Sequence, residues 1–198
     1  MEEKDYIWTK QLMRMESIIE RKYTIEEYFT FCEEHEGRFE FVNGEISEMS
    51  GESVTANQIA GNIHYFMRSA LDDQPYILVQ NAVKLQVSES RIFRIPDFLI
   101  FKEEGNKHRY ATEPVLIVEV LSDSSAKTDR FTKLNEYKSI PSLLYYLIVD
   151  QETCYVEMHA RDKNRWYVEV YNKTGQVINL PHFNVSLPLS KIYQRIFS

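Results

Sequence analysis

Pro114-Val-Leu-Ile-Val-Glu-Val-Leu121 is the most apolar stretch of the sequence, and it contains one carboxylate, Glu119. A short apolar run of this kind predicts a buried β-strand. An ionised glutamate inside such a strand has to be paired or bound to a metal, because burying an unpaired charge is costly. Glu119 is therefore the best indication of function in the chain.

A second carboxylate, Asp97, lies in another apolar run, Arg94-Ile-Pro-Asp-Phe-Leu-Ile-Phe101, directly after a proline that suits the start of a strand. If the two strands are neighbours in one sheet, the acids converge as oxygen ligands for a hard cation such as Mg²⁺. Taken alone, Asp97 has a simpler interpretation as a strand-start carboxylate bound by backbone amides or a lysine. The pair together favours a site.

The composition is that of one ordinary globular domain, with 198 residues of which 43% are hydrophobic. A formal charge of -7 argues against broad electrostatic contact with nucleic acid, so any phosphate-binding surface has to be local. The two cysteines have no CxxC spacing, and no apolar run approaches the length of a membrane span. We expect a cytoplasmic protein without membrane contact. Because there is no GxGxxG or P-loop motif, we expect no nucleotide cofactor.

Local signals predict an α/β (α+β) chain with a mixed central sheet flanked by helices. Thr24-Ile-Glu-Glu27 is a capping box that begins a helix ending near Gly37, and Asn43-Gly44 predicts a β-hairpin. The apolar spacing over 54–73 is that of an amphipathic helix. Further strands are expected at 76–87, 95–101, 115–121 and 143–150. A helix is expected at 127–139, between the last two of these strands. Towards the C-terminus we expect a hairpin from 153–160 and 165–171 and then a short helix from 189.

Asp129, Lys133 and Tyr137 are spaced by four on the helix predicted after the Glu119 strand. The simpler interpretation is an ordinary salt bridge between residues four apart, with an aromatic neighbour. The position of the helix raises the odds of a functional role, since Lys133 can extend over the carboxylate end of the strand and polarise an attacking water.

These residues form an ordered set that resembles a known family. The chain resembles the Uma-two family of restriction-endonuclease-like proteins, within the PD-(D/E)xK nuclease superfamily. The resemblance is carried by four segments: Pro96-Asp97, Glu119-Val-Leu-Ser-Asp-Ser-Ser125, Asp129 to Tyr137, and 140–150. The resemblance runs from about residue 23 to the C-terminus. It implies an N-terminal extension over 1–22 and a single nuclease-like domain over 23–198, with a restriction-endonuclease-like core and N-terminal and C-terminal β-hairpins.

The resemblance also implies roles for individual residues. Asp97 and Glu119 would bind Mg²⁺, or Mn²⁺ as a substitute, with the Val120 carbonyl as a further ligand. The superfamily lysine two residues after the glutamate is replaced by Leu121, so Lys133 is the candidate replacement. Supporting residues would be Glu40, Gln58, Asp129 and Tyr137. Glu40 also fits a solvated hairpin glutamate, and relatives often carry His-Gln where this chain has Asn57-Gln58.

The leading hypothesis is a Mg²⁺-dependent DNA endonuclease that acts as a homodimer. An alternative is a nuclease-fold module that binds nucleic acid or protein without cutting, through a basic rim formed by Lys102, Lys107, His108, Arg109, Lys127, Arg130 and Lys138. A third possibility is an assembly protein whose C-terminal aromatic hairpin pairs subunits. The catalytic set expected under the leading hypothesis is Asp97, Glu119 and Lys133.

Overall fold

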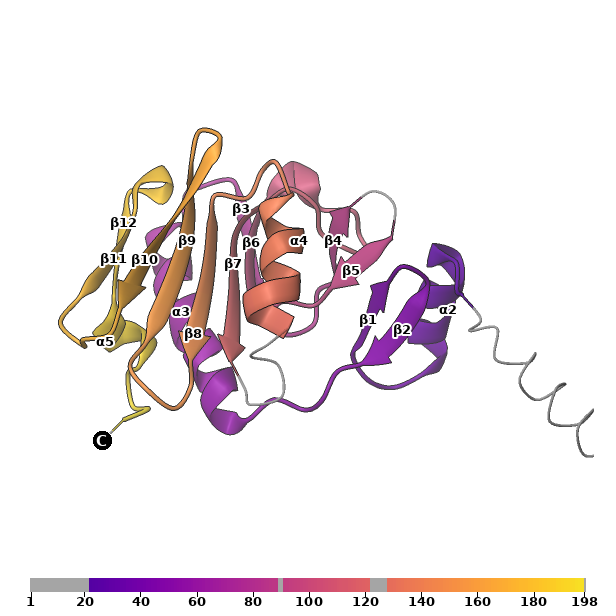
Figure 1. Ribbon diagram of the computed structural model, residues 1–198, viewed down its shortest axis with the longest axis horizontal. Helices are drawn as coiled ribbons and strands as arrows, with labels where there is room; N and C mark the ends of the chain where they lie inside the picture. The colour runs from indigo at the N-terminus through magenta and orange to yellow at the C-terminus, as the bar shows by residue number, and fades with distance from the viewer. Residues whose placement is uncertain (1–21, 89–90, 122–127, 198) are drawn as a thin grey trace, which may run out of the picture.

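The computed structural model describes residues 22–88, 91–121 and 128–197. Within these residues the chain forms a four-stranded, a six-stranded and a two-stranded sheet together with several helices, which confirms the predicted mixed α/β class. The four-stranded sheet and helix α2 (Ile25–Glu34) lie at one end of the molecule, and the two-stranded sheet lies at the other (Figure 1).

The N-terminal signals are confirmed in detail. Both hydrogen bonds of the capping box are present, from the Glu27 amide to Thr24 Oγ1 (3.2 Å) and from the Thr24 amide to Glu27 Oε2 (2.8 Å). Strands β1 (Phe39–Val42) and β2 (Glu45–Glu48) form the predicted hairpin. Asn43 and Gly44 both have positive φ (53° and 95°), as a tight turn of this kind requires.

Two predicted strands differ from the structure in their bounds. The run 76–87 separates into β3 (Tyr76–Gln80) and β4 (Leu85–Ser88), because Asn81 adopts a left-handed φ of 60° and ends β3. The strand predicted over 95–101 begins only at Phe98, as β6 (Phe98–Lys102), and a short strand that was not predicted, β5 (Ile92–Arg94), precedes it. Pro96 has no amide hydrogen for a strand ladder, and the Ile95 amide donates to Glu40 Oε1 (3.3 Å). Asp97 therefore directly precedes a strand.

The six-stranded sheet has the order β10-β9-β8-β7-β6-β3 and contains the site strands. Strand β7 (Pro114–Leu121) is antiparallel to β6 and parallel to β8 (Tyr145–Asp150). Helix α3 (Val54–Ala70) precedes β3, and α4 (Leu134–Lys138) connects β7 to β8. The chain order helix, three sheet strands, helix, strand is the core implied by the nuclease resemblance, with β4 and β5 inserted into the four-stranded sheet β2-β1-β5-β4.

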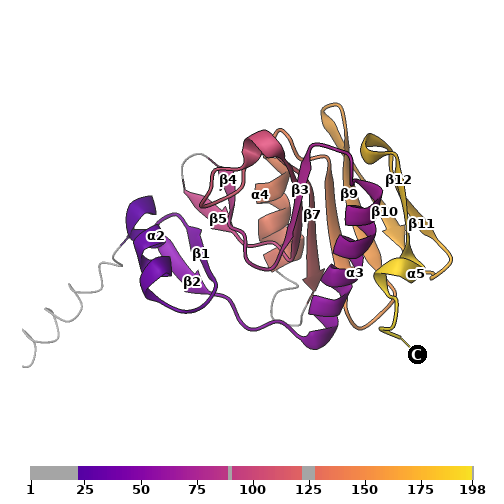
Figure 2. The ribbon, with the colours of Figure 1, turned by 180° about the vertical axis from the view of Figure 1, so that it is seen from behind.

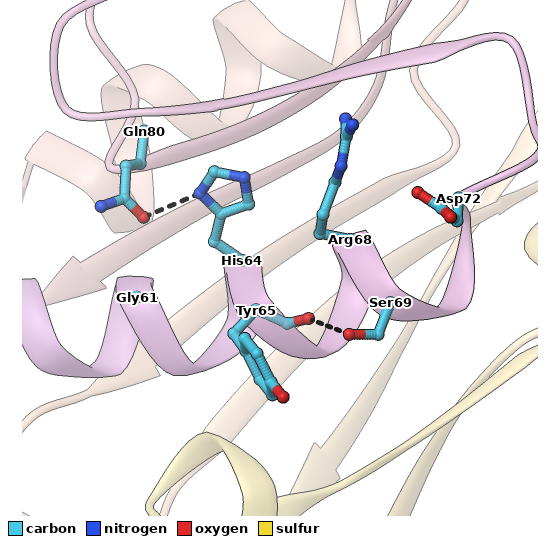
Figure 3. A pocket seen from close by; sticks show the side chains of 7 residues that line it. All are labelled: Gly61, His64, Tyr65, Arg68, Ser69, Asp72 and Gln80. Carbon is cyan, nitrogen blue, oxygen red and sulfur yellow. Dashed lines mark hydrogen bonds between the residues drawn. The ribbon is translucent and has the colours of Figure 1, made fainter.

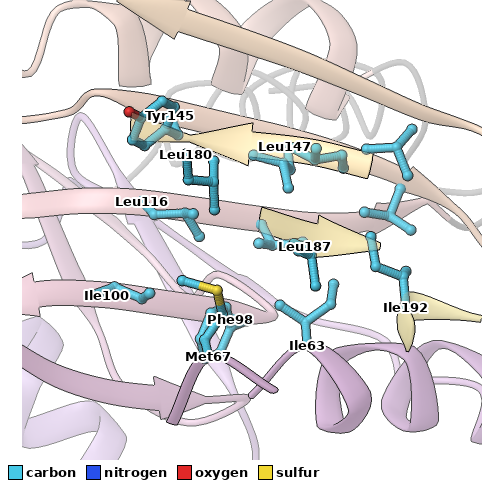
Figure 4. Close-up of a cluster of buried hydrophobic side chains, with 14 of the residues drawn as sticks. Ile63, Met67, Phe98, Ile100, Leu116, Tyr145, Leu147, Leu180, Leu187 and Ile192 are labelled. Carbon is cyan, nitrogen blue, oxygen red and sulfur yellow. The ribbon is translucent and has the colours of Figure 1, made fainter. Parts of the chain in front are cut away.

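The two helices cover opposite faces of this sheet, as the front and back views show (Figures 1 and 2). Helix α3 contributes Ile63 and Met67 to an apolar cluster with Phe98, Leu116 and Leu147 of the sheet (Figure 4). Helix α4 packs on the other face, where Tyr137 lies among side chains such as Leu99 and Ile117. No helix among the described residues is both long and apolar enough to cross a bilayer.

The helix predicted over 127–139 is partly irregular. A π-helical segment, η2 (Thr128–Lys133), leads into α4 and ends at Lys133. Single π-helical turns are rare in proteins, and those that occur often lie at functional sites. The turn predicted at 122–125 and residue 127 lie outside the described residues, as does the side chain of Asp129.

The C-terminal region extends the sheet as predicted and adds a second hairpin that was not predicted. Strands β9 (Val156–Asp162) and β10 (Arg165–Tyr171) form the expected hairpin. Strands β11 (Val177–Leu180) and β12 (Val185–Pro188) pair with each other and lead into α5 (Leu189–Ile192), where Ile192 is buried as expected. The 3-10 turns are η1 (Glu103–Gly105) and η3 (Pro181–Phe183).

Candidate active site

The two acids singled out in the sequence lie at neighbouring strands. The register of β6 and β7 pairs Phe98 with Val118, and one step further along this register Asp97 lies opposite Glu119. Directly opposed residues of an antiparallel pair project to the same face of the sheet. The Val120 amide donates to Asp97 Oδ2 at 2.6 Å, so the Asp97 carboxylate is fixed against the backbone beside Glu119.

Glu119 is buried, with 2% of its surface exposed, and it binds two side chains from the segment that follows β7. Its Oε1 accepts hydrogen bonds from Lys133 Nζ at 3.0 Å and from the Tyr137 hydroxyl at 2.7 Å. Burial, and then the negative charge of Glu119, raise the pKa of Tyr137 well above its ordinary value. Tyr137 therefore stays a neutral donor at physiological pH.

Lys133 lies between two carboxylates. Besides its contact with Glu119, its Nζ is 3.5 Å from Glu40 Oε1, and only 5% of the residue is exposed. Burial opposes ionisation of Glu40, but Lys133 and Arg94 outweigh it and lower the pKa of this carboxyl. The structure thus brings Glu40 into the cluster, whereas a solvated hairpin glutamate was the simpler expectation.

A second cation, Arg94, was missed by the sequence interpretation. Its Nη1 donates to Glu40 Oε2 at 2.7 Å, and its Nε and Nη2 bind both oxygens of Glu136 at 2.8 Å. Burial alone would lower the pKa of Arg94, but the two carboxylates raise it above its ordinary value. The cluster is therefore a chain of alternating charges that runs from Glu119 through Lys133, Glu40 and Arg94 to Glu136.

Asn81 also lies beside the acids and was not predicted. Its backbone amide donates to the Asp97 carbonyl at 3.2 Å, but neither Nδ2 nor Oδ1 of its buried side chain has a hydrogen-bond partner. A buried amide left without partners is costly and calls for an explanation. No sequence pattern marked this residue, because its burial depends on segments distant in the chain.

Gln58 and Asp129 are not placed in the cluster by any described contact. Gln58 is half-buried on α3, which covers the opposite face of the sheet, and it lines a hollow with Glu52, Ser53 and Asn57. The side chain of Asp129 is outside the described residues. Their supporting roles stay predictions, as does that of the Val120 carbonyl.

A larger hollow, of about 660 Å³, lies away from the acids on the outer side of α3 (Figure 3). Its lining includes Gln80, whose side chain faces His64 at 3.1 Å, together with Arg68 and Asp72. The hollow is open, and most of its polar groups are exposed side chains on one helix. We therefore assign the chemistry to the buried charges and not to this hollow.

The donor set at Asp97 and Glu119 fits a hard divalent cation. Mg²⁺ is usually bound through one or two carboxylates, with water and substrate phosphate completing its coordination. No group of three His, Cys, Asp or Glu side chains suited to a metal occurs in the described part of the chain. Among the described residues, a metal held by Asp97 and Glu119 would therefore have only these two carboxylates as side-chain ligands. Among the described side chains of the cluster, two cations, Lys133 and Arg94, accompany four carboxylates: Glu40, Asp97, Glu119 and Glu136. A divalent cation would offset the excess negative charge of the two remaining carboxylates.

Comparison with known proteins identifies the family. The model of the Uma2 family, described as "Putative restriction endonuclease", matches residues 25–190. The chain belongs to the Uma2 family. It is 31% identical over 149 residues to uncharacterized protein sll1609 of Synechocystis sp., a match that covers 73% of this chain and 84% of that protein. It is 25% identical to uncharacterized protein slr1290 of the same organism, over 87% of this chain and 92% of the relative.

A solved structure shares the fold of this Uma2 protein. It is a crystal structure from Anabaena variabilis, described as a putative nuclease belonging to DUF820, with a TM-score of 0.68. The match covers 85% of this chain and 97% of that one at 13% identity. At this identity the likeness supports the nuclease-like fold alone, and the residues of the site have to be argued from the geometry.

Proposed function

We propose that this Uma2 protein is a Mg²⁺-dependent endonuclease that hydrolyses phosphodiester bonds in DNA. One observation carries the proposal: Lys133 Nζ lies 3.0 Å from Glu119, a buried carboxylate that the strand register places opposite Asp97. A carboxylate pair with an adjacent ammonium group is suited to metal-assisted phosphodiester hydrolysis, because the acids can hold the cation and the ammonium can stabilise developing negative charge. Membership of a nuclease-like family supports the same reaction class.

Each residue of the cluster has a distinct task in this proposal. Asp97 and Glu119, with the Val120 carbonyl, would hold the cation, which supplies Lewis-acid stabilisation of the phosphoryl oxygens when bound. Lys133 orients the attacking water and stabilises negative charge that develops on the phosphate. Water oxygen bonds to phosphorus as the bond from phosphorus to the 3′ oxygen breaks, and one proton of the water ends on that 3′ oxygen. The products are a 5′-phosphate and a 3′-hydroxyl. Tyr137 and Glu40 hold Glu119 and Lys133 in place.

Lys133 compensates for the missing superfamily lysine. Leu121, which occupies the expected lysine position, is 5% exposed and packs in the apolar cluster beneath α4. An ammonium group at that position would lose this packing. Lys133 instead approaches Glu119 from the π-helical segment, so a cation is present although it comes from a different element.

The test is incubation of supercoiled plasmid and single-stranded DNA with the purified protein in Mg²⁺, Mn²⁺ or EDTA. We expect metal-dependent cutting that falls at least about 100-fold in Asp97→Asn, Glu119→Gln and Lys133→Met. The matched control is Glu48→Gln, which neutralises an exposed carboxylate on β2 and should leave cutting unchanged. Absence of cutting on every substrate, or undiminished cutting by Asp97→Asn, contradicts the proposal.

The alternative of a non-cutting nucleic-acid module has less support from the structure. Three cations of its expected basic rim lie near acidic partners: Arg109 is 2.7 Å from Glu33, Arg130 is 3.5 Å from Glu157, and Lys102 is 4.0 Å from Glu113. Such pairing reduces the local positive potential available to phosphates. A gel shift at low salt without cleavage would favour this alternative.

A further inference from the structure

The outer strand of the six-stranded sheet is exposed at five of its seven residues, while Trp166 and Tyr171 are half-buried. Strand β10 is the last strand in the order and pairs with β9 on its inner side. Three of its apolar side chains are large and open to solvent: Tyr167 (43% exposed), Val168 (51%) and Val170 (47%). An edge strand of this kind offers a row of backbone donors and acceptors to another chain.

The register of the hairpin determines which backbone groups face outward. Asp162 pairs with Arg165 across a two-residue turn, so the Arg165 amide belongs to the ladder with β9. Because the pattern alternates, the backbone groups of Tyr167 and Glu169 also face β9. Those of Trp166, Val168 and Val170 face the open edge, and no described hydrogen bond uses them on that side.

The edge lacks several of the features by which natural proteins prevent edge pairing, and its two charged residues, Arg165 and Glu169, are of opposite sign. Its seven residues contain no proline and no lysine, and the pairing with β9 shows no register shift or bulge. Exposed valines face solvent where a monomeric protein usually places charges. The strand is therefore suited to a partner of its own kind.

The charges of β10 are self-complementary. If two copies pair antiparallel about a two-fold axis at Tyr167, each Arg165 lies opposite the partner's Glu169. Trp166 then lies opposite the partner's Val168, and the two Tyr167 side chains face each other. Opposite charges and aromatic pairs at directly opposed positions stabilise antiparallel strands. A two-fold axis repeats each of these contacts, as closed dimers require.

We propose that the open edge of β10 pairs with the same edge of a second copy, which joins two six-stranded sheets into one continuous sheet. The proposal is independent of the nuclease activity, because it concerns the opposite end of the sheet from β6 and uses no residue of the acid cluster. It identifies the surface that would form the homodimer expected from the sequence.

The first test measures mass by light scattering coupled to size exclusion. The full-length protein should elute at twice the 23.5 kDa of one chain. Val168→Pro removes an amide hydrogen that faces the open edge and should give a monomer with an unchanged circular dichroism spectrum. A monomeric wild-type protein at 100 µM or so would overturn the proposal.

The second test swaps charges. Arg165→Glu and Glu169→Arg should each weaken the dimer by about tenfold or more, because each places like charges opposite each other, and the double variant should restore it. Lys191→Glu is the matched control, since it makes the same charge change on an exposed residue of α5. A dimer that neither single variant weakens would overturn the Tyr167 register.

A third test locates the axis directly. Directly opposed residues in a pair without backbone hydrogen bonds are close enough for a disulfide. In a Cys32→Ser, Cys154→Ser background, Tyr167→Cys should crosslink into a covalent dimer under mild oxidation. Stronger crosslinking of Val168→Cys would place the axis one residue further along and overturn the assigned register.

Discussion

The two faces of the six-stranded sheet are both covered, but by different kinds of side chain. The α3 face is closed by an apolar cluster from α3, the sheet and the C-terminal hairpin (Figure 4). The α4 face combines apolar packing with buried charges, among them Glu119, Lys133 and Arg94. Apolar burial stabilises a fold, whereas buried ion pairs often contribute little net stability and are costly when broken. Under the proposed function, the apolar face maintains the fold and the charged face carries the chemistry.

The largest expected effect comes from removing the centre of the charged network. Arg94→Met removes the guanidinium that binds both the buried Glu40 and the half-buried Glu136. We expect the free energy of unfolding to fall by about 3–5 kcal/mol, the usual effect of breaking a buried ion pair from one side. Urea denaturation followed by circular dichroism measures it. A loss below about 1 kcal/mol would mean that water already solvates these carboxylates.

A cavity on the apolar face should destabilise the protein without altering the acid cluster. Leu147 is fully buried on β8 among the side chains beneath α3. Leu147→Ala should lower the free energy of unfolding by about 3 kcal/mol, within the range for such truncations. Mn²⁺ binding, measured by calorimetry below the melting temperature, should be unchanged. Weaker Mn²⁺ binding by the folded variant would show that the two faces are coupled.

Lowering the pH should reduce the contribution of the charged face to the free energy of unfolding. Burial alone would raise the pKa of Glu40, but Lys133 and Arg94 lower it below its ordinary value in the folded state. A carboxyl with a lowered folded pKa contributes stability above its unfolded pKa, and this is lost as the pH falls through about 4 towards the folded pKa. Stability measured between pH 7 and pH 3 should therefore fall less steeply in Glu40→Gln than in the wild-type protein. An identical slope would rule out a contribution from Glu40.

Local signals in the sequence predicted those parts of the fold that depend on neighbouring residues. Thr24 with Glu27, and Asn43 with Gly44, determine a helix start and a turn through contacts only a few positions apart. Glu119 stood out because its own strand is apolar. The pairing of β1 with β5 was not predictable in this way, since it joins segments about fifty residues apart in the chain.

The same limit applies to the candidate site. Lys133 and Tyr137 were marked by their spacing of four on the helix that follows the Glu119 strand, and both donate hydrogen bonds to the Glu119 carboxylate. Arg94 and Glu136 carried no such mark, because a buried arginine and a surface arginine look alike until their partners are known. The π-helical segment was also missed, since its residues fit an ordinary helix.

The smallest expected effect concerns the orphan amide beside Asp97. Asn81 has a left-handed φ of 60°, which glycine adopts without strain, and its buried side chain has no hydrogen-bond partner. Asn81→Gly should therefore raise the free energy of unfolding by about 1 kcal/mol, because the cost of the unpaired amide exceeds the added flexibility of the unfolded chain. Thermal and urea unfolding measure the change.

Asn184→Gly is the matched control for this variant. Asn184 also has a left-handed φ, of 54°, but it is exposed and its side chain remains solvated. Its replacement should change stability by no more than a few tenths of a kcal/mol. If Asn81→Gly stabilises the protein and Asn184→Gly does not, the unpaired side-chain amide of Asn81 lowers the free energy of unfolding of the wild-type protein. Equal effects of the two variants would attribute the change to backbone conformation alone.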